Sequence, residues 1–340
     1  MNWTDILVFL GKLNLRKSWN AFQVISSFYL SSILKKPLQW GLPFNISIEP
    51  TTQCNLGCPE CPSGLKSFTR DTGNLEIDFY HKFLEENYKH LIYLYFYFQG
   101  EPYLHPKFLE LVKAASAKNI YTVTSTNAHF LSPRKAEETV LSGLDRILIS
   151  IDGTTQESYE SYRIGGKLSK VIEGTKNLVA AKKRLKSKTP HIIIQFLVVK
   201  PNEHQIPEIL ALGKELEVDE VKLKTAQIYD YQGGSELIPS QEQYSRYKQN
   251  LDGTYSIKNK LENKCWKLWH SCVLTWDANI VPCCFDKDAK YAMGNLKDKS
   301  FKEIWRNEAY IRFRSQLLTN RKSIDICTNC TEGLSVWAEE

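Results

Sequence analysis

The sequence predicts an α/β protein: a partial (β/α)6 barrel, similar to an incomplete TIM barrel, followed by a small C-terminal domain. Six short runs rich in β-branched and aromatic residues recur between positions 45 and 225, and the first five are each followed by a stretch with helical periodicity. Strands that alternate with helices form βαβ units around a buried parallel sheet. Six units are too few to close an eight-stranded barrel, so we expect it to be partly open.

The predicted strands follow in chain order, and the helical periodicity is clearest in HPKFLELVKAASAKN and IPEILALGKELE. In barrels of this kind the functional side chains lie at the carboxyl ends of the strands, which tells us where to look for a site. The six runs are NISIEP (45–50), LIYLYFYF (91–98), IYTVTST (120–126), RILISID (146–152), HIIIQFLVV (191–199) and VKLKTAQ (221–227).

Composition divides the chain into four segments. Residues 1–43 form an N-terminal helical extension, 44–228 the partial barrel core, 229–262 a polar connection and 263–340 the C-terminal domain, which holds six of the nine cysteines. The extension contains FQVISSFYLSSIL, flanked by the basic residues Arg16, Lys17, Lys35 and Lys36. A helix that packs over the barrel and an interfacial membrane helix both fit this segment.

The overall composition excludes several classes of protein. With 42% hydrophobic and 24% charged residues and no long apolar run, the chain is neither disordered nor membrane-spanning. The net charge of +6 is small, and the basic run AAKKRLKSK (180–188) is interpreted as the exposed end of a helix, so no nucleic-acid partner is predicted. The N-terminus does not resemble a secretory signal, and we expect a cytoplasmic protein whose cysteines bind metal or act in catalysis.

Three cysteines, Cys54, Cys58 and Cys61, lie in the stretch TTQCNLGCPECPSG directly after the first predicted strand. Thiolates are ligands for iron–sulfur clusters and for zinc, and structural sites of both kinds normally close with four protein ligands. Only three ligands are near, and the loop contains no histidine. A cluster held by three thiolates would keep one iron open to a ligand from outside the protein.

The pattern Cys-x3-Cys-x2-Cys, on the loop after the first strand of a (β/α)6 array, resembles the radical S-adenosylmethionine (SAM) superfamily. The resemblance implies a [4Fe–4S] cluster whose open iron is bound by the amino and carboxylate groups of SAM. It also implies that one electron from the cluster cleaves SAM, and that the resulting 5′-deoxyadenosyl radical abstracts a hydrogen atom from the substrate.

Further strand ends resemble the SAM-binding segments of that family. In FQGEPYLHP the resemblance assigns the SAM ammonium to Gly100 and Glu101, and Arg163 resembles the arginine that pairs with the SAM carboxylate. Hydrogen bonds within a strand-end loop are the alternative for Ser150 and Arg163. The complete predicted SAM site is Gly100, Glu101, Ser125, Asn127, Ser150, Asp152 and Arg163.

Two residues depart from the family pattern. Gln99 replaces the first glycine of the usual Gly-Gly-Glu segment, and Glu60 replaces the aromatic residue that precedes the third cysteine in many relatives. Glu60 cannot stack on adenine, so we expect the adenine contact to come from elsewhere, around residues 225–227.

The C-terminal cysteines resemble the SPASM domains of radical SAM enzymes and their shortened form, the Twitch domain. The resemblance implies one auxiliary [4Fe–4S] cluster bound by Cys265, Cys283, Cys327 and Cys330 around a β-hairpin, whose turn is Asp277-Ala278-Asn279, with helices following it. Asn tolerates positive φ, which suits the turn. Cys284 is set aside because strand neighbours point to opposite faces, and Cys272 because it fits a buried apolar thiol. Replacement of an assigned ligand by either, and a structural zinc site, stay open.

The leading functional prediction is a radical SAM oxidoreductase or maturase that modifies a peptide or protein. Radical dehydrogenation of a small-molecule alcohol and a non-catalytic iron–sulfur or zinc protein are the alternatives. The predicted partners are a reductant protein such as flavodoxin or ferredoxin, a peptide or small-molecule substrate, and a separate peptide-recognition protein. No catalytic side chain is assigned.

Overall fold

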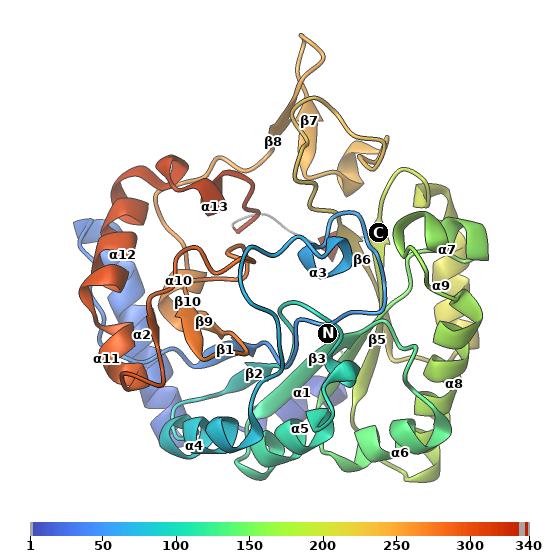
Figure 1. Ribbon diagram of the computed structural model, residues 1–340, viewed down its shortest axis with the longest axis horizontal. Helices are drawn as coiled ribbons and strands as arrows, with labels where there is room; N and C mark the ends of the chain where they lie inside the picture. The colour runs from blue at the N-terminus through green and yellow to red at the C-terminus, as the bar shows by residue number, and fades with distance from the viewer. Residues whose placement is uncertain (1–2, 333–336, 339–340) are drawn as a thin grey trace. The chain divides into compact units, whose positions relative to one another are not determined.

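The computed structural model describes residues 3–332, together with residues 337 and 338 (Figure 1). The chain divides into two compact units. Unit 1 comprises Met1–Gln53, Phe68–Val123 and Leu261–Gly333, and unit 2 comprises Cys54–Ser67, Thr124–Lys260 and Leu334–Glu340. This division interleaves segments from the whole chain, so it does not follow the composition boundaries, and the four-segment domain scheme stays a prediction.

Unit 1 contains a sheet in the order β11-β10-β9-β1-β2-β3. Strand β1 pairs in parallel with β2 on one side and with β9 on the other, whereas β10 runs antiparallel to β9 and to β11. Strands β1, β2 and β3 are those that the β-branched runs predict, whereas β9, which is also parallel to β1, is not among the predicted runs. The strands are β1 (Asn45–Ile48), β2 (Tyr93–Tyr95), β3 (Tyr121–Thr126), β9 (Ser271–Leu274), β10 (Asn279–Val281) and β11 (Gly294–Asn295).

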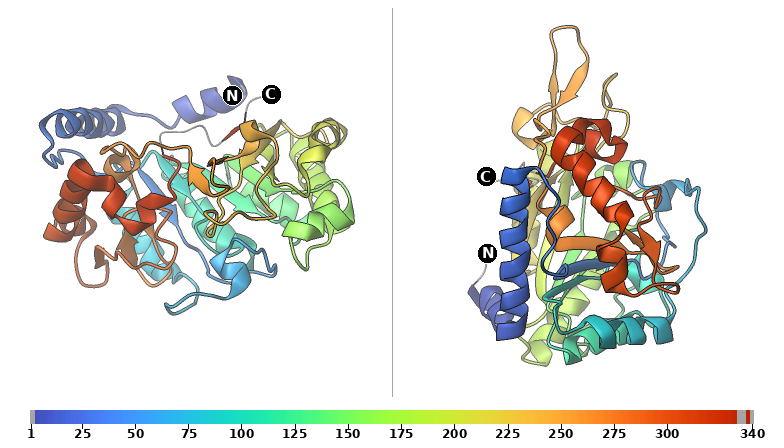
Figure 2. Two further views of the ribbon diagram at one scale, coloured as in Figure 1. Left: turned by 90° about the horizontal axis from the view of Figure 1, so that it is seen from above. Right: turned by 90° about the vertical axis from the view of Figure 1, so that its left-hand side faces the viewer.

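The helices of unit 1 include the predicted N-terminal extension, which forms two helices, α1 and α2 (Figure 2). Phe9 of α1 stacks on Tyr93 of β2, and Phe28 of α2 packs edge-on against Trp269 of α10. Their bounds are α1 (Trp3–Leu10), α2 (Leu15–Leu34), α4 (Ile77–Asn87), α5 (Phe108–Ala117), α10 (Lys267–His270), α11 (Phe301–Trp305), α12 (Glu308–Asn320) and α13 (Asp325–Thr328), with 3-10 turns η1 (Pro102–Leu104) and η4 (Arg321–Ser323).

Unit 2 contains the order β4-β5-β6-β12, in which β4, β5 and β6 are parallel and β12 is antiparallel to β6. Helices α6, α8 and α9 flank these strands (Figure 1). The elements are α3 (Pro62–Leu65), α6 (Pro133–Leu141), β4 (Arg146–Ser150), α7 (Gln156–Tyr162), α8 (Leu168–Arg184), β5 (His191–Val198), η2 (Glu203–Gln205), α9 (Ile206–Glu215), β6 (Glu220–Thr225), η3 (Glu242–Tyr244), β7 (Tyr247–Gln249), β8 (Tyr255–Ile257) and β12 (Trp337–Ala338).

The α/β prediction with six parallel strands is therefore confirmed, and the segment predicted as a plain connection has structure of its own. Strands β7 and β8 form an antiparallel hairpin within residues 229–262. Tyr247 of β7 is buried and stacks on Tyr231 with ring centroids 4.5 Å apart. The polar composition hid this hairpin because its apolar contacts come from a few isolated tyrosines.

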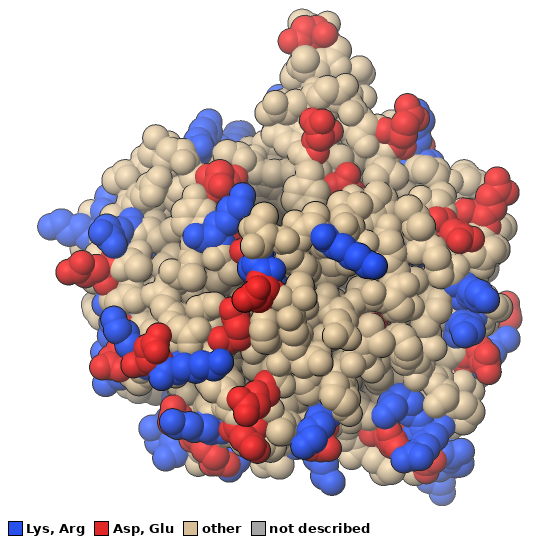
Figure 3. Space-filling view, viewed as in Figure 1, with Lys and Arg blue, Asp and Glu red and all other residues tan. Residues whose placement is uncertain are grey.

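Charged side chains are interspersed over the surface. The basic run at 180–188 closes α8, as predicted, and Lys182 forms an ion pair with Asp219 at 2.6 Å. On the face shown in Figure 3, basic and acidic groups alternate and do not gather into one basic field. Within residues 3–332, no helix is both long and apolar enough to cross a membrane.

Candidate functional site

The cysteine loop, residues 54–61, belongs to unit 2, and none of its three cysteines forms a disulfide. Cys58 is buried, whereas Cys54 and Cys61 are partly exposed. All three pack against one apolar cluster, so the loop offers three thiolate ligands at the margin of a core, which suits an iron–sulfur cluster. The buried members of that cluster besides Cys58 are Leu56, Tyr162, Val199, Ala226, Ile228, Ile238 and Tyr247.

Helix α3 begins directly after Cys61 and fixes the backbone of the loop. The N–H of Leu65 donates to the carbonyl of Cys61 at 2.9 Å. A Cβ added to Gly64 would lie 2.6 Å from the backbone nitrogen of Cys58, so only glycine allows the helix to approach so closely. On the other side, the N–H of Gly57 donates to the carbonyl of Ile164 at 2.9 Å. The loop is thus held by backbone contacts that leave its thiols available.

Arg163 and Asp152, two predicted SAM contacts, form an ion pair beside the cysteine loop. Nε of Arg163 donates to Oδ2 of Asp152 at 2.5 Å, and Nη1 lies 3.7 Å from Sγ of Cys58. Asp152 is fully buried, and its Oδ1 accepts from the N–H of Leu197 at 2.7 Å. Burial alone would lower the pKa of Arg163, but the charges of Asp152 and Cys58 outweigh it and hold that pKa well above its ordinary value. A permanently charged guanidinium therefore faces the thiol of Cys58.

Three further predicted SAM contacts lie at strand ends in unit 2. Asn127 follows β3, and its Nδ2 donates to Oδ1 of Asn55 in the cysteine loop at 2.8 Å. Ser125 is half-buried near the end of β3, and Ser150 is the buried last residue of β4. The positions at strand ends are as expected, while contact of these side chains with SAM stays a prediction.

Glu60, the residue at the usual aromatic position, has a structural partner in unit 2. Its Oε2 accepts from the backbone N–H of Tyr229 at 2.8 Å. Residues at the start of the β7–β8 hairpin also hold the segment 225–229. Nε of Arg246 donates to Oγ1 of Thr225 at 2.9 Å, and the hydroxyl of Tyr247 accepts from the N–H of Ile228 at 2.8 Å. Glu60 therefore links the cysteine loop to the segment after β6, where the sequence predicts the adenine contact.

Gly100 and Glu101 lie in unit 1, packed against the end of the segment that precedes the cysteine loop. Gly100 has a φ of +74°, and a Cβ there would lie 2.3 Å from the carbonyl oxygen of Thr51, so no other residue fits. The N–H of Glu101 donates to the carbonyl of Gln53 at 2.7 Å, and its carboxylate caps η1 by accepting from the N–H of Tyr103 at 3.2 Å. Glycine is thus required at this position by close backbone packing within unit 1.

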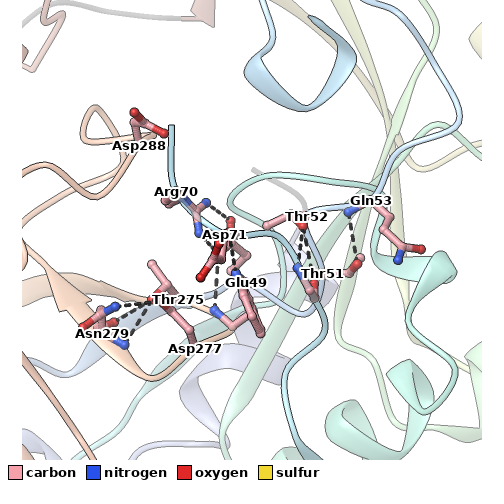
Figure 4. Close-up of polar contacts among 12 residues, drawn as sticks. Glu49, Thr51, Thr52, Gln53, Arg70, Asp71, Thr275, Asp277, Asn279 and Asp288 are labelled. Carbon is pink, nitrogen blue, oxygen red and sulfur yellow. Dashed lines mark hydrogen bonds and ion pairs between the residues drawn. The ribbon is translucent and has the colours of Figure 1, made fainter. Parts of the chain in front are cut away.

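A buried ion pair that sequence reasoning missed holds the end of β1 (Figure 4). Nη1 and Nη2 of Arg70 donate to Oε2 and Oε1 of Glu49 at 2.9 and 2.5 Å, and the N–H of Trp276 donates to Oε2 at 3.2 Å. Burial raises the pKa of Glu49, although Arg70 opposes the shift. The only signal in the sequence was a carboxylate directly after an apolar strand. The pair joins β1 to the β9–β10 turn within unit 1.

The β9–β10 hairpin is present where the sequence predicts it, but its turn works differently. The positive φ, +75°, belongs to Ala278 and not to Asn279. Oγ1 of Thr275 donates to Oδ1 of Asp277 at 2.5 Å, and Nδ2 of Asn279 donates to Oδ2 of Asp277 at 2.7 Å. These side-chain bonds favour the turn and offset the cost of a left-handed alanine.

The C-terminal cysteines all lie in unit 1, and none of the six forms a disulfide. Cys327 and Cys330 are buried around α13. Burial raises the pKa of Cys265 and of Cys283. Cys272 is buried in β9, as a structural thiol would be. The role of Cys265, Cys283, Cys327 and Cys330 as ligands of one cluster stays a prediction.

The reason given for setting aside Cys284 is wrong. Strand β10 ends at Val281, so Cys283 and Cys284 lie in the turn that follows, and the alternation of strand side chains does not apply to them. Either cysteine is therefore available to a cluster.

Two cations that sequence reasoning missed contact these thiols. Nζ of Lys267 lies 3.6 Å from Sγ of Cys284, and Nη2 of Arg321 donates to Sγ of Cys330 at 3.3 Å. The pKa of Lys267 is raised above its ordinary value because the charge of Cys284 outweighs the effect of burial. Isolated basic residues carry no motif, so only the structure reveals them. Positive charge beside clustered thiolates suits an anionic cluster.

The described donors are too far apart to hold a single metal ion. Within residues 3–332, no three His, Cys, Asp or Glu side chains lie close enough together to bind one common ion. An iron–sulfur cluster has less stringent needs, because each thiolate binds a different iron. Cysteines outside any disulfide, their apolar surroundings and the facing cations are the features of the chain that fit such a cluster.

Two family models match successive parts of the chain. Residues 48–212 match the model of the radical SAM superfamily, and residues 265–331 match the SPASM iron–sulfur cluster-binding domain. The chain is 27% identical over 313 residues to the tungsten-containing aldehyde ferredoxin oxidoreductase cofactor-modifying protein of Pyrococcus furiosus, covering 84% of this chain and 86% of that protein. It is 26% identical over 281 residues to the PqqA peptide cyclase of Gluconobacter oxydans, covering 77% and 76%.

Among solved structures, Streptococcus suis SuiB bound to S-adenosylmethionine has a TM-score of 0.65 at 14% identity, covering 93% of this chain and 77% of SuiB. A second structure of SuiB, with a TM-score of 0.63, is bound to the precursor peptide SuiA. At this identity the likeness shows the fold alone. The two family models match most of the chain, in the order and at the positions of its two cysteine sets, and the protein is therefore an enzyme of the radical SAM superfamily with a C-terminal SPASM domain.

Proposed function

We propose that this enzyme modifies a peptide or protein, in a reaction that begins with reductive cleavage of SAM at a [4Fe–4S] cluster held by Cys54, Cys58 and Cys61. The observation that carries the proposal is the cysteine loop itself: three closely spaced thiols, none in a disulfide, against an apolar cluster, with Arg163 facing Cys58. A cluster bound there would have one iron without a protein ligand, and SAM bound to it supplies a 5′-deoxyadenosyl radical that removes a hydrogen atom from the substrate.

The residues of the chain then have distinct roles toward SAM. Arg163 presents a guanidinium of fixed charge, which suits the SAM carboxylate. Both oxygens of the buried Asp152 already accept hydrogen bonds from the chain, so we assign it the task of positioning Arg163 and not a direct contact. We assign the SAM ammonium to Gly100 and Glu101, and hydroxyl or carboxylate contacts to Ser125, Asn127 and Ser150.

We further propose one auxiliary [4Fe–4S] cluster bound by Cys265, Cys283, Cys327 and Cys330. Closed by four thiolates, such a cluster serves one-electron transfer, and a ferredoxin or flavodoxin would deliver the electrons. Lys267 and Arg321 neutralise part of its negative charge.

Two relatives support a peptide substrate. One is a peptide cyclase by name, and SuiB has been crystallised with a precursor peptide. Peptides share no single charge pattern, so the charges of the site do not identify this class of substrate. We therefore propose the class from these relatives. We also propose that a separate protein contributes to recognition of the peptide.

The test is anaerobic reconstitution with iron and sulfide, followed by SAM and dithionite, with 5′-deoxyadenosine measured by mass spectrometry. We expect the wild type and the Cys272→Ala control to form it, and the triple variant Cys54→Ala, Cys58→Ala, Cys61→Ala to form none. A fully loaded wild-type protein that forms no 5′-deoxyadenosine would identify a non-catalytic iron–sulfur protein and overturn the proposal.

The substrate class needs its own measurement. A pool of synthetic peptides should raise the rate of 5′-deoxyadenosine formation above the substrate-free rate and yield peptides lighter by two hydrogens or cross-linked. If a pool of small secondary alcohols, and not the peptides, has this effect, the enzyme is a small-molecule dehydrogenase.

A further inference from the structure

The N-terminal helices α1 and α2 expose an unusual amount of apolar surface. Of the seventeen large hydrophobic side chains that are exposed among the described residues, eleven lie within the first 40 positions. We call these eleven the N-terminal apolar face. They are Trp3, Leu7, Leu10, Leu15, Trp19, Phe22, Ile25, Tyr29, Ile33, Leu34 and Trp40.

In α2 this face is the reverse of the pattern of an ordinary surface helix. The spacing of Leu15, Trp19, Phe22, Tyr29 and Ile33 by three, four or seven residues places them along one side of the helix. An ordinary surface helix would bury such a stripe and expose the polar side. Here Leu15 is 92% exposed and Ile33 73% exposed.

The opposite side of α2 is buried although much of it is polar. Lys17, Ser27 and Ser31 are buried, and the hydroxyl of Ser27 donates to the carbonyl of Val24 at 3.0 Å. Nζ of Lys17 donates to the carbonyl oxygen of Asn119 at 2.6 Å, and burial lowers its pKa to about 8. The helix is therefore anchored to unit 1 by its polar side, which leaves the apolar stripe outward. Figure 2 shows α1 and α2, in blue, as consecutive helices on the outside of the ribbon.

The charged residues of the N-terminal segment indicate the charge of the surface that it binds. Residues 1–43 contain five basic residues and a single acidic one. That acid, Asp5, is buried and accepts from the hydroxyl of Tyr121, so no acidic side chain of residues 3–43 is exposed. Arg16, Lys35 and Lys36 are exposed. Lys17, which the sequence grouped with these flanking residues, is not among them because it is buried.

We propose that α1 and α2 bind the surface of a membrane that contains anionic lipids. Aromatic and aliphatic side chains of a helix lying in the interface enter the boundary between headgroups and acyl chains, and flanking basic residues bind the anionic headgroups. Tryptophan and tyrosine favour this boundary because their rings are apolar and their N–H and O–H groups remain hydrated. The helices lie on the membrane, because the stripe of α2 is apolar on one side only and its other side carries the buried Lys17, Ser27 and Ser31.

The proposal is tested by cosedimentation of the full-length protein with vesicles of equal parts phosphatidylglycerol and phosphatidylcholine. We expect binding to these vesicles, and weaker binding to phosphatidylcholine alone. The variant Trp19→Ser, Phe22→Ser, Tyr29→Ser should lower the partition coefficient by roughly tenfold or more. The variant Arg16→Gln, Lys35→Gln, Lys36→Gln should lower it on anionic vesicles by about fivefold per charge. Leu251→Ser, which removes an equally exposed leucine from the β7–β8 turn, should bind like the wild type.

All changed side chains are exposed, so folding should be retained, and circular dichroism of each variant confirms it. Three outcomes would overturn the proposal. In the first, the wild type does not sediment with anionic vesicles. In the second, the serine variant binds as well as the wild type. In the third, sedimentation velocity shows that the wild type is a dimer joined through the apolar face. The serine variant is then monomeric, and vesicles do not affect the dimer. The test does not depend on SAM chemistry, so it stands apart from the proposed reaction.

Discussion

The two cysteine sets differ in the number of thiols they supply and in the charges that face them. The cysteine loop has three cysteines, and its facing cation, Arg163, is itself paired with the buried Asp152. The C-terminal set has six cysteines, and its two cations, Lys267 and Arg321, contact thiols directly. The cysteine loop thus has fewer than four cysteines and an oriented guanidinium. The C-terminal set has more than four cysteines and two cations beside them.

This difference corresponds to two kinds of chemistry. A site that lacks one protein ligand and holds an arginine in place by a carboxylate is suited to binding a molecule with a carboxylate of its own. A site with four or more thiolates and nearby cations is suited to holding a closed cluster and to setting its reduction potential. The predictions below test whether the two sets divide the work in this way.

The largest effect is expected at the cysteine loop. Cys58→Ala should abolish 5′-deoxyadenosine formation and reduce the iron content from about eight to about four atoms per chain, because one of two [4Fe–4S] clusters is lost. Iron analysis and the cleavage assay measure both. Cys272→Ala, which removes a buried thiol outside both proposed ligand sets, is the matched control. Retention of cleavage by Cys58→Ala would show that the loop does not hold the active cluster.

The next effect distinguishes the two sets. Cys327→Ala should also lose about four iron atoms, but it should still cleave SAM without substrate turnover, because the cysteine loop is unchanged. Product formation with a substrate should fall by roughly a hundredfold or more. If Cys327→Ala loses SAM cleavage as completely as Cys58→Ala, the two sets do not act independently and the division of work is wrong.

A smaller effect is expected from the carboxylate that holds Arg163. Asp152→Asn leaves the guanidinium charged but removes its buried partner, so the KM for SAM should rise roughly tenfold while the iron content stays at the wild-type level. The free energy of unfolding should fall by roughly 3 kcal/mol, the cost of breaking a largely buried ion pair. Glu217→Gln, which breaks an exposed ion pair with Lys183, is the control and should change neither quantity. An unchanged KM would remove Asp152 and Arg163 from the SAM site.

The parallel strands could be predicted from sequence because strands buried on both faces are continuous runs of β-branched residues, as in HIIIQFLVV. The hairpin β7–β8 could not, since its burial depends on single tyrosines such as Tyr247 within polar sequence. The reversed face of α2 was only partly visible: the sequence showed an apolar helix with basic flanks, but not that its serines and Lys17 face inward.

The candidate site divides in the same way. Cysteine spacing is a local pattern, so both cysteine sets were found from the sequence. The groups that tune them come from residues with no motif: Glu60 bonds to the backbone of Tyr229, and Lys267 and Arg321 reach thiols 17 and 9 positions away. Such long-range polar contacts depend on how the chain folds, and sequence spacing does not encode them.

The smallest effect concerns the cations of the C-terminal set. Lys267→Met and Arg321→Met each keep an unbranched apolar stem and remove one positive charge beside the thiolates. Because a nearby cation favours the more reduced, more negative cluster, each change should lower the reduction potential of the auxiliary cluster. A charge interaction of about 1 kcal/mol corresponds to about 40 mV for one electron. A redox titration followed by electron paramagnetic resonance measures the potential of each cluster, and the signal of the cluster in the cysteine loop should not move. If only the potential of the cluster in the cysteine loop shifted and the auxiliary potential stayed unchanged, Lys267 and Arg321 would lie outside the auxiliary site. The two sets would then differ only in their number of thiols.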